Sequence, residues 1–400
     1  MLNPSIALLI SIASILVLLR LRWHPGLAIF AGSFIISLLV LPLLSIPAHM
    51  LQALLTFQTL RLLVIVAGAL TLSSLMEEKG LLARLATAME SIGPKLAIHL
   101  IPMAIGLVPM PAGALVSATA SQGLAQKLGL TPERATFINY WFRHMWEFSI
   151  PVYPGIIIAS VILAVPFLSI IKILSPITVL AILSGAVISY VMLRKTKKIE
   201  KDPNKNIVFN LIRASWPILL LLPLILLGLE AMIAFPLVLV LLAVQQRTRW
   251  PELKKTLKYG LNPKILFMLY AIILYKATID SSNAAGVLIE NMQAIGLPDL
   301  VVLVALPLLI GVATGYSPAF AGVALPLLVP YIVTGSGINS PALLVAYVTG
   351  FMGVLLSPMH LCLILSTEYF KANLVHVYKY ILPLCLGIET VVILIYLVAS

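Results

Sequence analysis

The chain has 400 residues, of which 61% are hydrophobic and only 10% charged, and its mean hydropathy is +1.10. This composition excludes a soluble globular domain, because apolar segments of about 18 or more residues recur from end to end, as in membrane proteins. The formal net charge of +12 does not indicate nucleic-acid binding, because the Lys and Arg residues gather in short loops between apolar segments.

The first half of the chain predicts a series of membrane elements. No basic stretch precedes the first apolar segment and no small-residue cleavage site follows it, so we expect a retained helix and not a signal peptide. Apolar helices are predicted at 6–19, 27–44 and 62–75, then an amphipathic stretch at 80–91, a broken element at about 97–125, a proline-interrupted helix at 135–164 and a closing helix at 174–193.

The second half predicts the same series at an offset of about 203 to 207 residues. AMESIG at 88–93 aligns with NMQAIG at 291–296, and Tyr140 and Pro151 align with Tyr347 and Pro358. Its elements are predicted at 212–227, 231–244, 265–279, 282–293, 299–334, 342–365 and 377–398. We therefore expect a first repeat at 1–193 with a hairpin at about 97–125, a basic linker at 194–206, and a second repeat at 207–400 with a hairpin at about 299–334.

The positions of the basic loops indicate how the repeats are related. If each broken element enters the membrane and returns on the same side, nearly all Lys and Arg residues fall on one side, as the positive-inside rule requires. A full crossing would scatter the basic loops over both sides. We therefore predict an all-α membrane protein with two inverted repeats of five spanning helices and one re-entrant hairpin each, basic loops in the cytoplasm and both termini outside.

Each broken element has a tip rich in Gly and Pro. Pro109, Pro111 and Gly113 interrupt a run without charged residues, and 314–318 forms the matching tip. Proline ends a helix and glycine permits a tight reversal. The reversal leaves free N–H groups, which attract anions, and free carbonyls, which can hold a cation. Paired interrupted segments of this kind are typical of secondary transporters; the alternative is a pair of packing kinks.

A cluster of ionisable residues lies in the stretch from Asn139 to Pro154. Arg143, His144 and Glu147 fall within about one turn, and charged groups at membrane depth are costly and usually functional. Arg143 could grip a substrate carboxylate, and His144 or Glu147 could carry a proton. The alternative is structural: Arg143 and Glu147, four residues apart, pair and brace the broken helix, and His144 is hydrogen-bonded in the core.

The two-hairpin repeat, with PMPAGALVSA in the first hairpin, resembles the ion-transporter superfamily, and more closely an uncharacterised prokaryotic membrane family within it that is related to gluconate permeases. The resemblance implies a scaffold part, a transport part that holds the hairpins, an elevator-like movement between them, and a homodimer. Sodium-coupled dicarboxylate carriers of this superfamily have Ser-Asn-Thr at both tips, whereas neither tip here contains Asn. This departure argues against sodium coupling and a dicarboxylate substrate.

The sequence thus predicts a secondary active transporter in the cell membrane that carries a small anion, such as an organic acid, coupled to H⁺ or Na⁺. It predicts no cofactor, no metal site, no nucleic-acid partner and no enzymatic activity; Cys362 and Cys385 are expected as free thiols. The alternatives are a membrane-embedded enzyme that uses His144 and Glu147, and an anion channel. The predicted substrate-binding residues are Pro109, Met110, Pro111, Ala112, Gly113, Ser117, Arg143, Gly315, Tyr316, Ser317, Pro318, Ala319 and Ser357, and the predicted coupling residues are His144, Glu147, Thr314 and His360.

Overall fold

The computed structural model describes residues 2–110, 113–194, 206–335 and 337–399, nearly all of them helical. Pro111, Ala112 and most of the predicted linker lie outside the described residues. The first half contains α1 (Pro4–Arg20), α2 (Pro25–Val40), the 3-10 turn η1 (Leu43–Ser45), α3 (Ile46–Leu55), α4 (Phe57–Glu78), α5 (Leu81–Glu90), α6 (Pro94–Gly106), α7 (Gly113–Lys127), α8 (Pro132–Arg143), the 3-10 turn η2 (Met145–Phe148), α9 (Pro154–Leu163) and α10 (Phe167–Leu193).

The second half begins at α11. It contains α11 (Ile207–Leu226), α12 (Ala231–Gln245), α13 (Trp250–Gly260), α14 (Pro263–Ser282), α15 (Ala284–Ala294), α16 (Asp299–Thr314), α17 (Ser317–Ile332), the two-residue strands β1 (Val333–Thr334) and β2 (Gly337–Ile338), α18 (Ser340–Leu356), α19 (Leu361–Phe370) and α20 (Leu374–Ala399). The strands pair antiparallel, with Val333 opposite Ile338.

Among the described residues each half holds ten α-helices in the same order, α1 to α10 and α11 to α20. The helices, the amphipathic stretches and the two helix breaks predicted from the sequence are confirmed. Helices α3 and α13 were not predicted, because both are short. The sequence of α13, WPELKKTLKYG, is so polar that it was assigned to a basic loop.

Polar caps followed by proline decide where several helices begin. The side chains of Asn3, Thr131 and Asn262 accept hydrogen bonds from backbone N–H groups of the first turns of α1, α8 and α14. In each case proline follows the cap, where it removes an N–H group that has no helical partner. These caps satisfy backbone N–H groups at the helix starts. They also mark where each helix begins, which a long apolar segment alone does not define.

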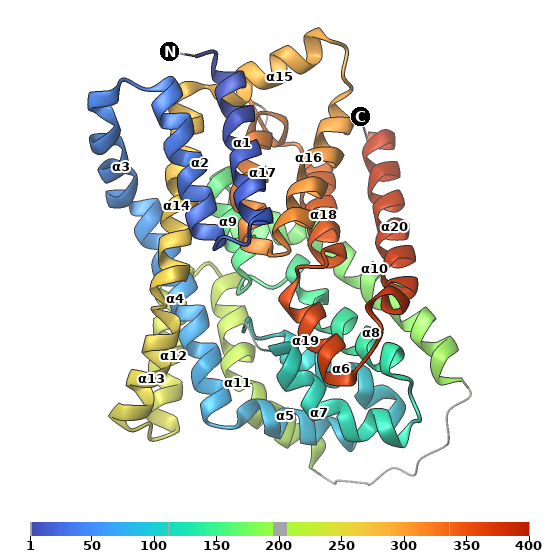
Figure 1. The fold of residues 1–400 in the computed structure, drawn as a ribbon. Helices are drawn as coiled ribbons and strands as arrows, with labels where there is room; N and C mark the ends of the chain where they lie inside the picture. Colours follow the sequence, from blue (N-terminus) through green and yellow to red (C-terminus); the bar gives the residue numbers. More distant parts are fainter. Residues whose placement is uncertain (1, 111–112, 195–205, 336, 400) are drawn as a thin grey trace.

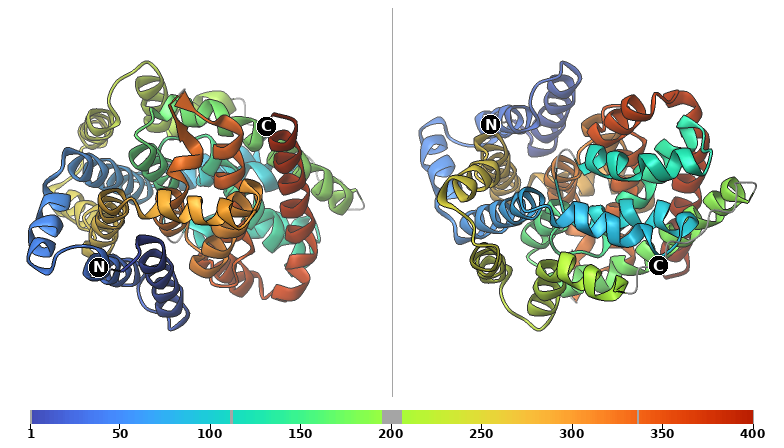
Figure 2. Two further views of the ribbon diagram at one scale, coloured as in Figure 1. Left: turned by 90° about the horizontal axis from the view of Figure 1, so that it is seen from above. Right: turned by 90° about the horizontal axis from the view of Figure 1, so that it is seen from below.

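Helices of the two halves contact each other in reciprocal pairs. Helix α2 packs on α14, and in the same way α12 packs on α4. Helix α1 packs on α15 and α11 packs on α5. Helix α9 packs on α17 and α19 packs on α7. In Figure 1 the chain starts and ends on the upper side, whereas α10 ends and α11 begins on the lower side. Figure 2 shows α15 across the upper face and α5 across the lower face.

The two broken elements lie at opposite levels of the molecule. In Figure 1, α6 and α7 occupy the lower part and α16 and α17 the upper part. In the views of Figure 2, α1 to α4 and α12 to α14 gather on one side, and the hairpins with α8 to α10 and α18 to α20 gather on the other. The turn between α1 and α2, expected at the level of the other basic loops, reaches only mid-height, because these helices have 17 and 16 residues.

Matching glycines let each hairpin approach the broken helix of its own half. A Cβ atom at Gly106 would lie 2.3 Å from the carbonyl oxygen of Arg143, and one at Gly311 would lie 2.1 Å from that of Gly350. Both distances are far below a normal contact distance, so the packing of α6 on α8 and of α16 on α18 requires glycine at these two positions. Gly106 and Gly311 are 205 residues apart, as the repeat predicts.

The aligned tyrosines hold the two halves together. The Tyr140 hydroxyl donates to the carbonyl of Leu355 at 2.9 Å, and the Tyr347 hydroxyl donates to the carbonyl of Glu147 at 3.2 Å. Each tyrosine therefore satisfies a carbonyl at the helix break of the opposite half. Such bonds matter at membrane depth, where no water replaces a missing partner.

Within the part of the chain that the structure describes, six helical segments are long and apolar enough to cross a membrane, according to their length and composition. They are 57–78, 167–193, 207–226, 250–282, 340–370 and 374–399. Helices α1, α2 and α12 are apolar but shorter. The chain is therefore a multi-pass helical membrane protein.

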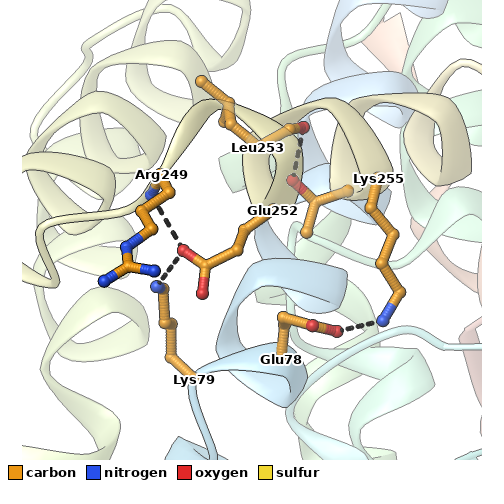
Figure 3. Close-up of polar contacts among 7 residues, drawn as sticks. Glu78, Lys79, Arg249, Glu252, Leu253 and Lys255 are labelled. Carbon is orange, nitrogen blue, oxygen red and sulfur yellow. Dashed lines mark hydrogen bonds and ion pairs between the residues drawn. The ribbon is translucent and has the colours of Figure 1, made fainter.

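Two ion pairs join the lower end of α4 to α13 (Figure 3). Lys79 Nζ lies 2.6 Å from a carboxylate oxygen of Glu252, and Lys255 Nζ lies 2.6 Å from one of Glu78. Glu252 also accepts the backbone N–H of Arg249 at 2.8 Å, so the same carboxylate caps α13. The Lys79 side chain is 13% exposed and the Lys255 side chain 69%, so the first pair is better shielded from solvent.

Double-mutant cycles should separate the two pairs. We expect the coupling free energy between Lys79→Met and Glu252→Gln to exceed that between Lys255→Met and Glu78→Gln, because exposed ion pairs contribute little. Unfolding of the detergent-purified protein would measure both cycles. Equal couplings would contradict the shielding argument.

Candidate functional site

One cavity of about 270 Å³ lies where the two hairpin tips and the two helix breaks meet. Its walls come from four segments far apart in the chain and from one residue each of α4 and α14. The lining residues are Leu70, Pro109, Met110, Arg143, His144, Glu147, Tyr153, Pro154, Ile265, Gly315, Tyr316, Ser317, Pro318, His360, Leu361 and Cys362. Tyr316 and Leu361 keep 37% and 49% of their surface exposed, so the cavity opens on their side.

Arg143 is the buried cation of this cavity. It is the last residue of α8 and only 3% exposed. Its Nη2 donates to the carbonyl oxygen of Met110 at 3.0 Å, and its Nη1 lies 3.5 Å from Cys362 Sγ. Its Nε has no hydrogen-bond partner in the structure. Buried polar groups normally have a hydrogen-bond partner, so this unpaired donor is an exception that calls for an explanation.

Gly113 is what allows the guanidinium to lie at the start of α7. A Cβ atom there would lie 2.1 Å from Arg143 Nη2 and 2.6 Å from Met110 Cγ. Any larger residue would therefore displace Arg143 from the hairpin tip. The glycine predicted to permit a turn thus also makes room for the cation.

Four helices begin at the cavity. Helix α9 begins at Pro154, α17 at Ser317 and α19 at Leu361, which all line it, and α7 begins at Gly113 against Arg143. The free N–H groups and the dipole of a helix N-terminus favour negative charge. Arg143 and these four N-termini therefore favour negative charge in the cavity, whereas the carboxyl group of Glu147 in its wall acts in the opposite direction when ionised.

Side-chain hydroxyls bond carbonyls at the opposite helix ends. Tyr153 donates to the carbonyl of Gly106 at the end of α6, and Ser357 donates to that of Val312 in the last turn of α16 at 2.7 Å. At the end of α18, Tyr378 donates to Leu356 at 3.0 Å. These carbonyls are therefore engaged with protein donors, and the N–H of Gly113 at the start of α7 is likewise bonded, to the carbonyl of Met110 at 3.1 Å.

Two imidazoles share one hydrogen bond in the cavity wall. His144 Nε2 and His360 Nε2 lie 3.2 Å apart, and His144 Nδ1 lies 2.6 Å from the carbonyl of Tyr140. His360 Nδ1 has no partner in the structure. A neutral imidazole carries one N–H group. Because His144 Nδ1 donates that hydrogen to the carbonyl of Tyr140, His144 Nε2 has none and accepts a hydrogen bond from His360 Nε2. Each ring comes from the helix break of a different half.

Glu147 contributes a carboxyl group that is half satisfied. Ser317, the first residue of α17, forms a side-chain hydrogen bond with it, and its Oε2 is buried without a partner. The ion pair expected from the four-residue spacing to Arg143 is not among those of the described residues. The reason is that α8 ends at Arg143, so Glu147, in η2, does not follow on the same helix face.

His144, His360 and Cys362 bring three potential metal-ligand atoms within 4.8 Å of one another. The donor set matches that of zinc sites. However, the Arg143 guanidinium lies against the Cys362 sulfur, and the helix N-termini add further positive potential. This field opposes a metal cation and favours an anion.

The cavity contains most of the residues predicted from the sequence. Ten of them line it: Pro109, Met110, Arg143, His144, Glu147, Gly315, Tyr316, Ser317, Pro318 and His360. Gly113 and Ser357 lie directly behind the lining, against Arg143 and Gly315 respectively. Their predicted roles in binding or coupling remain predictions.

Three predicted residues do not line the cavity. Ser117 lies a turn along α7, where its hydroxyl bonds Asn139 at 2.6 Å. Thr314 bonds the carbonyl of Gly311 within α16 at 3.4 Å, and Ala319 is fully buried in α17. Each was predicted because it is near a tip in the sequence. Its position around the helix axis, however, directs its side chain away from the cavity. Pro111 and Ala112 lie outside the described residues.

Sequence reasoning missed six of the lining residues: Leu70, Tyr153, Pro154, Ile265, Leu361 and Cys362. Tyr153 belongs to the same polar stretch as Arg143, and the proline that follows it marks the start of α9, so a signal existed. Cys362 was treated only as a free thiol, which both cysteines are. Leu70 and Ile265 carry no signal, because an apolar residue in a membrane helix looks the same wherever it faces.

Comparison with known proteins places the chain in context. A family model described as "Protein of unknown function (DUF401)" matches residues 3–399. No curated protein matches it. Among solved structures, the YdaH transporter of Alcanivorax borkumensis, whose topology is described as unusual, is similar with a TM-score of 0.59 and 14% identity, over 88% of this chain and 87% of that chain. At this identity the likeness concerns the fold alone.

The sign of the potential can be tested without knowing a ligand. Cys362 can be reacted with the anionic reagent methanethiosulfonate ethylsulfonate and with its cationic trimethylammonium analogue. We expect the ratio of the anionic to the cationic reaction rate to be about tenfold higher for Cys362 than for a free thiol in solution. Cys385, which is 1% exposed in α20, should stay unmodified, and Cys362→Ser should abolish labelling. Arg143→Gln should reduce the preference; a faster cationic reagent on the native protein would contradict the positive field.

Proposed function

The chain belongs to the DUF401 family of proteins of unknown function, and we propose that it is a secondary active transporter of a small organic anion. The observation that carries this proposal is the single cavity in which two hairpin tips, one from each half, meet the buried Arg143. Matched interrupted segments that meet inside a membrane protein are the usual plan of a transporter binding site. The fold shared with a transporter agrees with this function.

The charge distribution supports an anionic substrate. Arg143 and four helix N-termini face the cavity, and the opposing carbonyls of Gly106 and Val312 are bonded by Tyr153 and Ser357. A carboxylate could accept from Arg143 Nε and from the first turn of α17. The cavity volume of about 270 Å³ is near the lower end of ligand pockets, about 300–1,000 Å³, which fits a metabolite of a few carbon atoms.

The His144–His360 pair supports coupling to protons and not to sodium. A proton added to the pair places a second positive charge beside Arg143, which is costly in a buried site unless an anion is present. The anion and the proton therefore favour each other's binding, which is the thermodynamic requirement for symport. Glu147 is the alternative proton carrier, because one of its oxygens lacks a partner.

The reciprocal contacts support inverted repeats with ten crossings. We assign them to α1, α2, α4, the broken α8–α9 and α10, and to their counterparts α11, α12, α14, α18–α19 and α20. Helices α5, α13 and α15 then lie along the two surfaces, and the basic ends of α4, α7, α10 and α12 face the cytoplasm.

The way the cavity is divided supports an elevator-like movement. Only Leu70 of α4 and Ile265 of α14 belong to the side of the molecule that holds α1 to α4 and α12 to α14. Every polar lining residue belongs to the other side. We propose that the side with the polar lining residues moves with its substrate along an apolar surface of the side that holds α1 to α4 and α12 to α14, within a homodimer.

Uptake into proteoliposomes tests the function. A panel of small monocarboxylates and hydroxy acids should include one whose uptake saturates and is driven by an acidic outside, with sodium replaceable by potassium. Arg143→Ala should weaken its binding by about tenfold to a hundredfold, because the charged hydrogen bond from Nε is lost. Flux that rises linearly to high concentration would indicate a channel, product formation would indicate an enzyme, and no uptake or thermal shift with any anion would contradict the proposal.

Two glycines of α7 provide a matched pair for the role of the tip. Gly113→Ala should weaken binding of that anion about tenfold or more, because the new methyl group displaces the Arg143 guanidinium. Gly123→Ala should leave the dissociation constant unchanged, because nothing lies within 4 Å of its Cβ position. Isothermal titration would measure both, and equal affinities of the two variants would contradict the proposed placement of Arg143.

A further inference from the structure

A second cavity lies on the lipid-facing side of the first hairpin, apart from the substrate cavity. It has a volume of about 590 Å³ and runs between α6 and α10, with Phe142 of α8 at its back. None of the residues that line it lines the first cavity, and none of them is acidic. Leu96 and Tyr190 in its walls are 53% and 70% exposed, so it is open at the surface where lipid chains lie.

Basic groups gather at one end of this cavity. Lys95 is the second residue of α6, and Arg194 directly follows α10. Lys95 Nζ donates to the carbonyl of Leu193 at 2.9 Å, which holds the ammonium group next to Arg194. About one turn deeper, His99 Nε2 bonds the hydroxyl of Ser189. The end of the cavity near the membrane surface thus offers two cations, an imidazole and the N-terminus of α6.

The other end is apolar and deep. Met103 and Phe142 line it from α6 and α8, and Ile182 lines it from α10. From Arg194 to Ile182 there are twelve helical residues, about 18 Å at 1.5 Å per residue. This length accommodates most of an extended acyl chain, and a phosphate at the basic end would lie at headgroup level.

We propose that this cavity binds an anionic phospholipid, with its phosphate at Lys95 and Arg194 and one acyl chain between α6 and α10. Basic residues at the membrane surface attract anionic headgroups, and pockets of this kind between helices bind them. The proposal requires only that the chain spans the membrane, and does not depend on the transported substrate. The bound lipid would fill the gap between the first hairpin and α10.

The second half does not repeat this site. At the matching positions of α16, 205 residues further along the chain, Leu300 replaces Lys95 and Val304 replaces His99, and Asp299 begins the helix. An anionic headgroup would find no cation there and one carboxylate. The lipid site therefore belongs to one half, on the side of the membrane where α10 ends and the basic loops gather.

Native mass spectrometry of the full chain, purified in detergent and stripped of lipid, tests the proposal. Phosphatidylglycerol should bind with one tight site, and phosphatidylcholine with the same acyl chains should bind about tenfold more weakly. The double variant Lys95→Gln/Arg194→Gln should lose that preference. Lys254→Gln/Lys258→Gln, which removes two exposed charges from α13, should retain it.

Two further measurements separate the headgroup from the chain. Ala186→Trp fills the apolar part without changing charge, and should abolish the tight site in a variant that elutes as the native protein does in size-exclusion chromatography. Glycerol phosphate, which lacks acyl chains, should not compete at millimolar concentration. Equal binding of the two lipids to the native protein, an unchanged preference in Lys95→Gln/Arg194→Gln, or competition by glycerol phosphate would overturn the proposal.

Discussion

The structure depends on how the backbone is satisfied where two helices break inside the membrane. Hydrocarbon offers no hydrogen-bond partner, so each carbonyl at a break needs a donor from the protein. Tyr153, Ser357, Tyr140 and Tyr378 supply hydroxyl donors to carbonyls of α6, α16 and α18. These hydroxyls engage the carbonyls, while helices α7, α9, α17 and α19 begin at the same cavity or against Arg143, and the dipole of a helix N-terminus favours negative charge.

The halves have kept their packing and diverged in their chemistry. The carbonyls of Arg143 and Gly350 both lie against a hairpin glycine, Gly106 and Gly311 respectively. The side-chain space at Gly350 is filled by the Phe320 ring, which would lie 1.8 Å from a Cβ atom there. One half therefore presents a guanidinium to the cavity, whereas at the matching position of the other half the Phe320 ring fills the space, and neither Phe320 nor Gly350 lines the cavity.

The same asymmetry holds at the protein surface. The cavity between α6 and α10 ends in Lys95 and Arg194, whereas the matching helix of the second half begins with an aspartate. The proposed inverted repeats would place equivalent positions at opposite sides of the membrane, where lipid composition and potential differ. Divergence of surface charge is thus expected even where the core contacts remain reciprocal.

The sequence by itself determined the class, the repeated order of helices, the two breaks and the cluster around Arg143, because these depend on hydrophobic length, proline, glycine and rare charges, all of which are local signals. Only the tertiary structure decided which residues share the cavity. It set His144 against His360, which are 216 residues apart, and separated Arg143 from an ion pair with Glu147 by ending α8 between them. It also selected Leu70 and Ile265 from among many equivalent apolar residues. Apolar packing has no periodic or chemical mark in a membrane helix, so the direction each residue faces is known only once the helices are assembled.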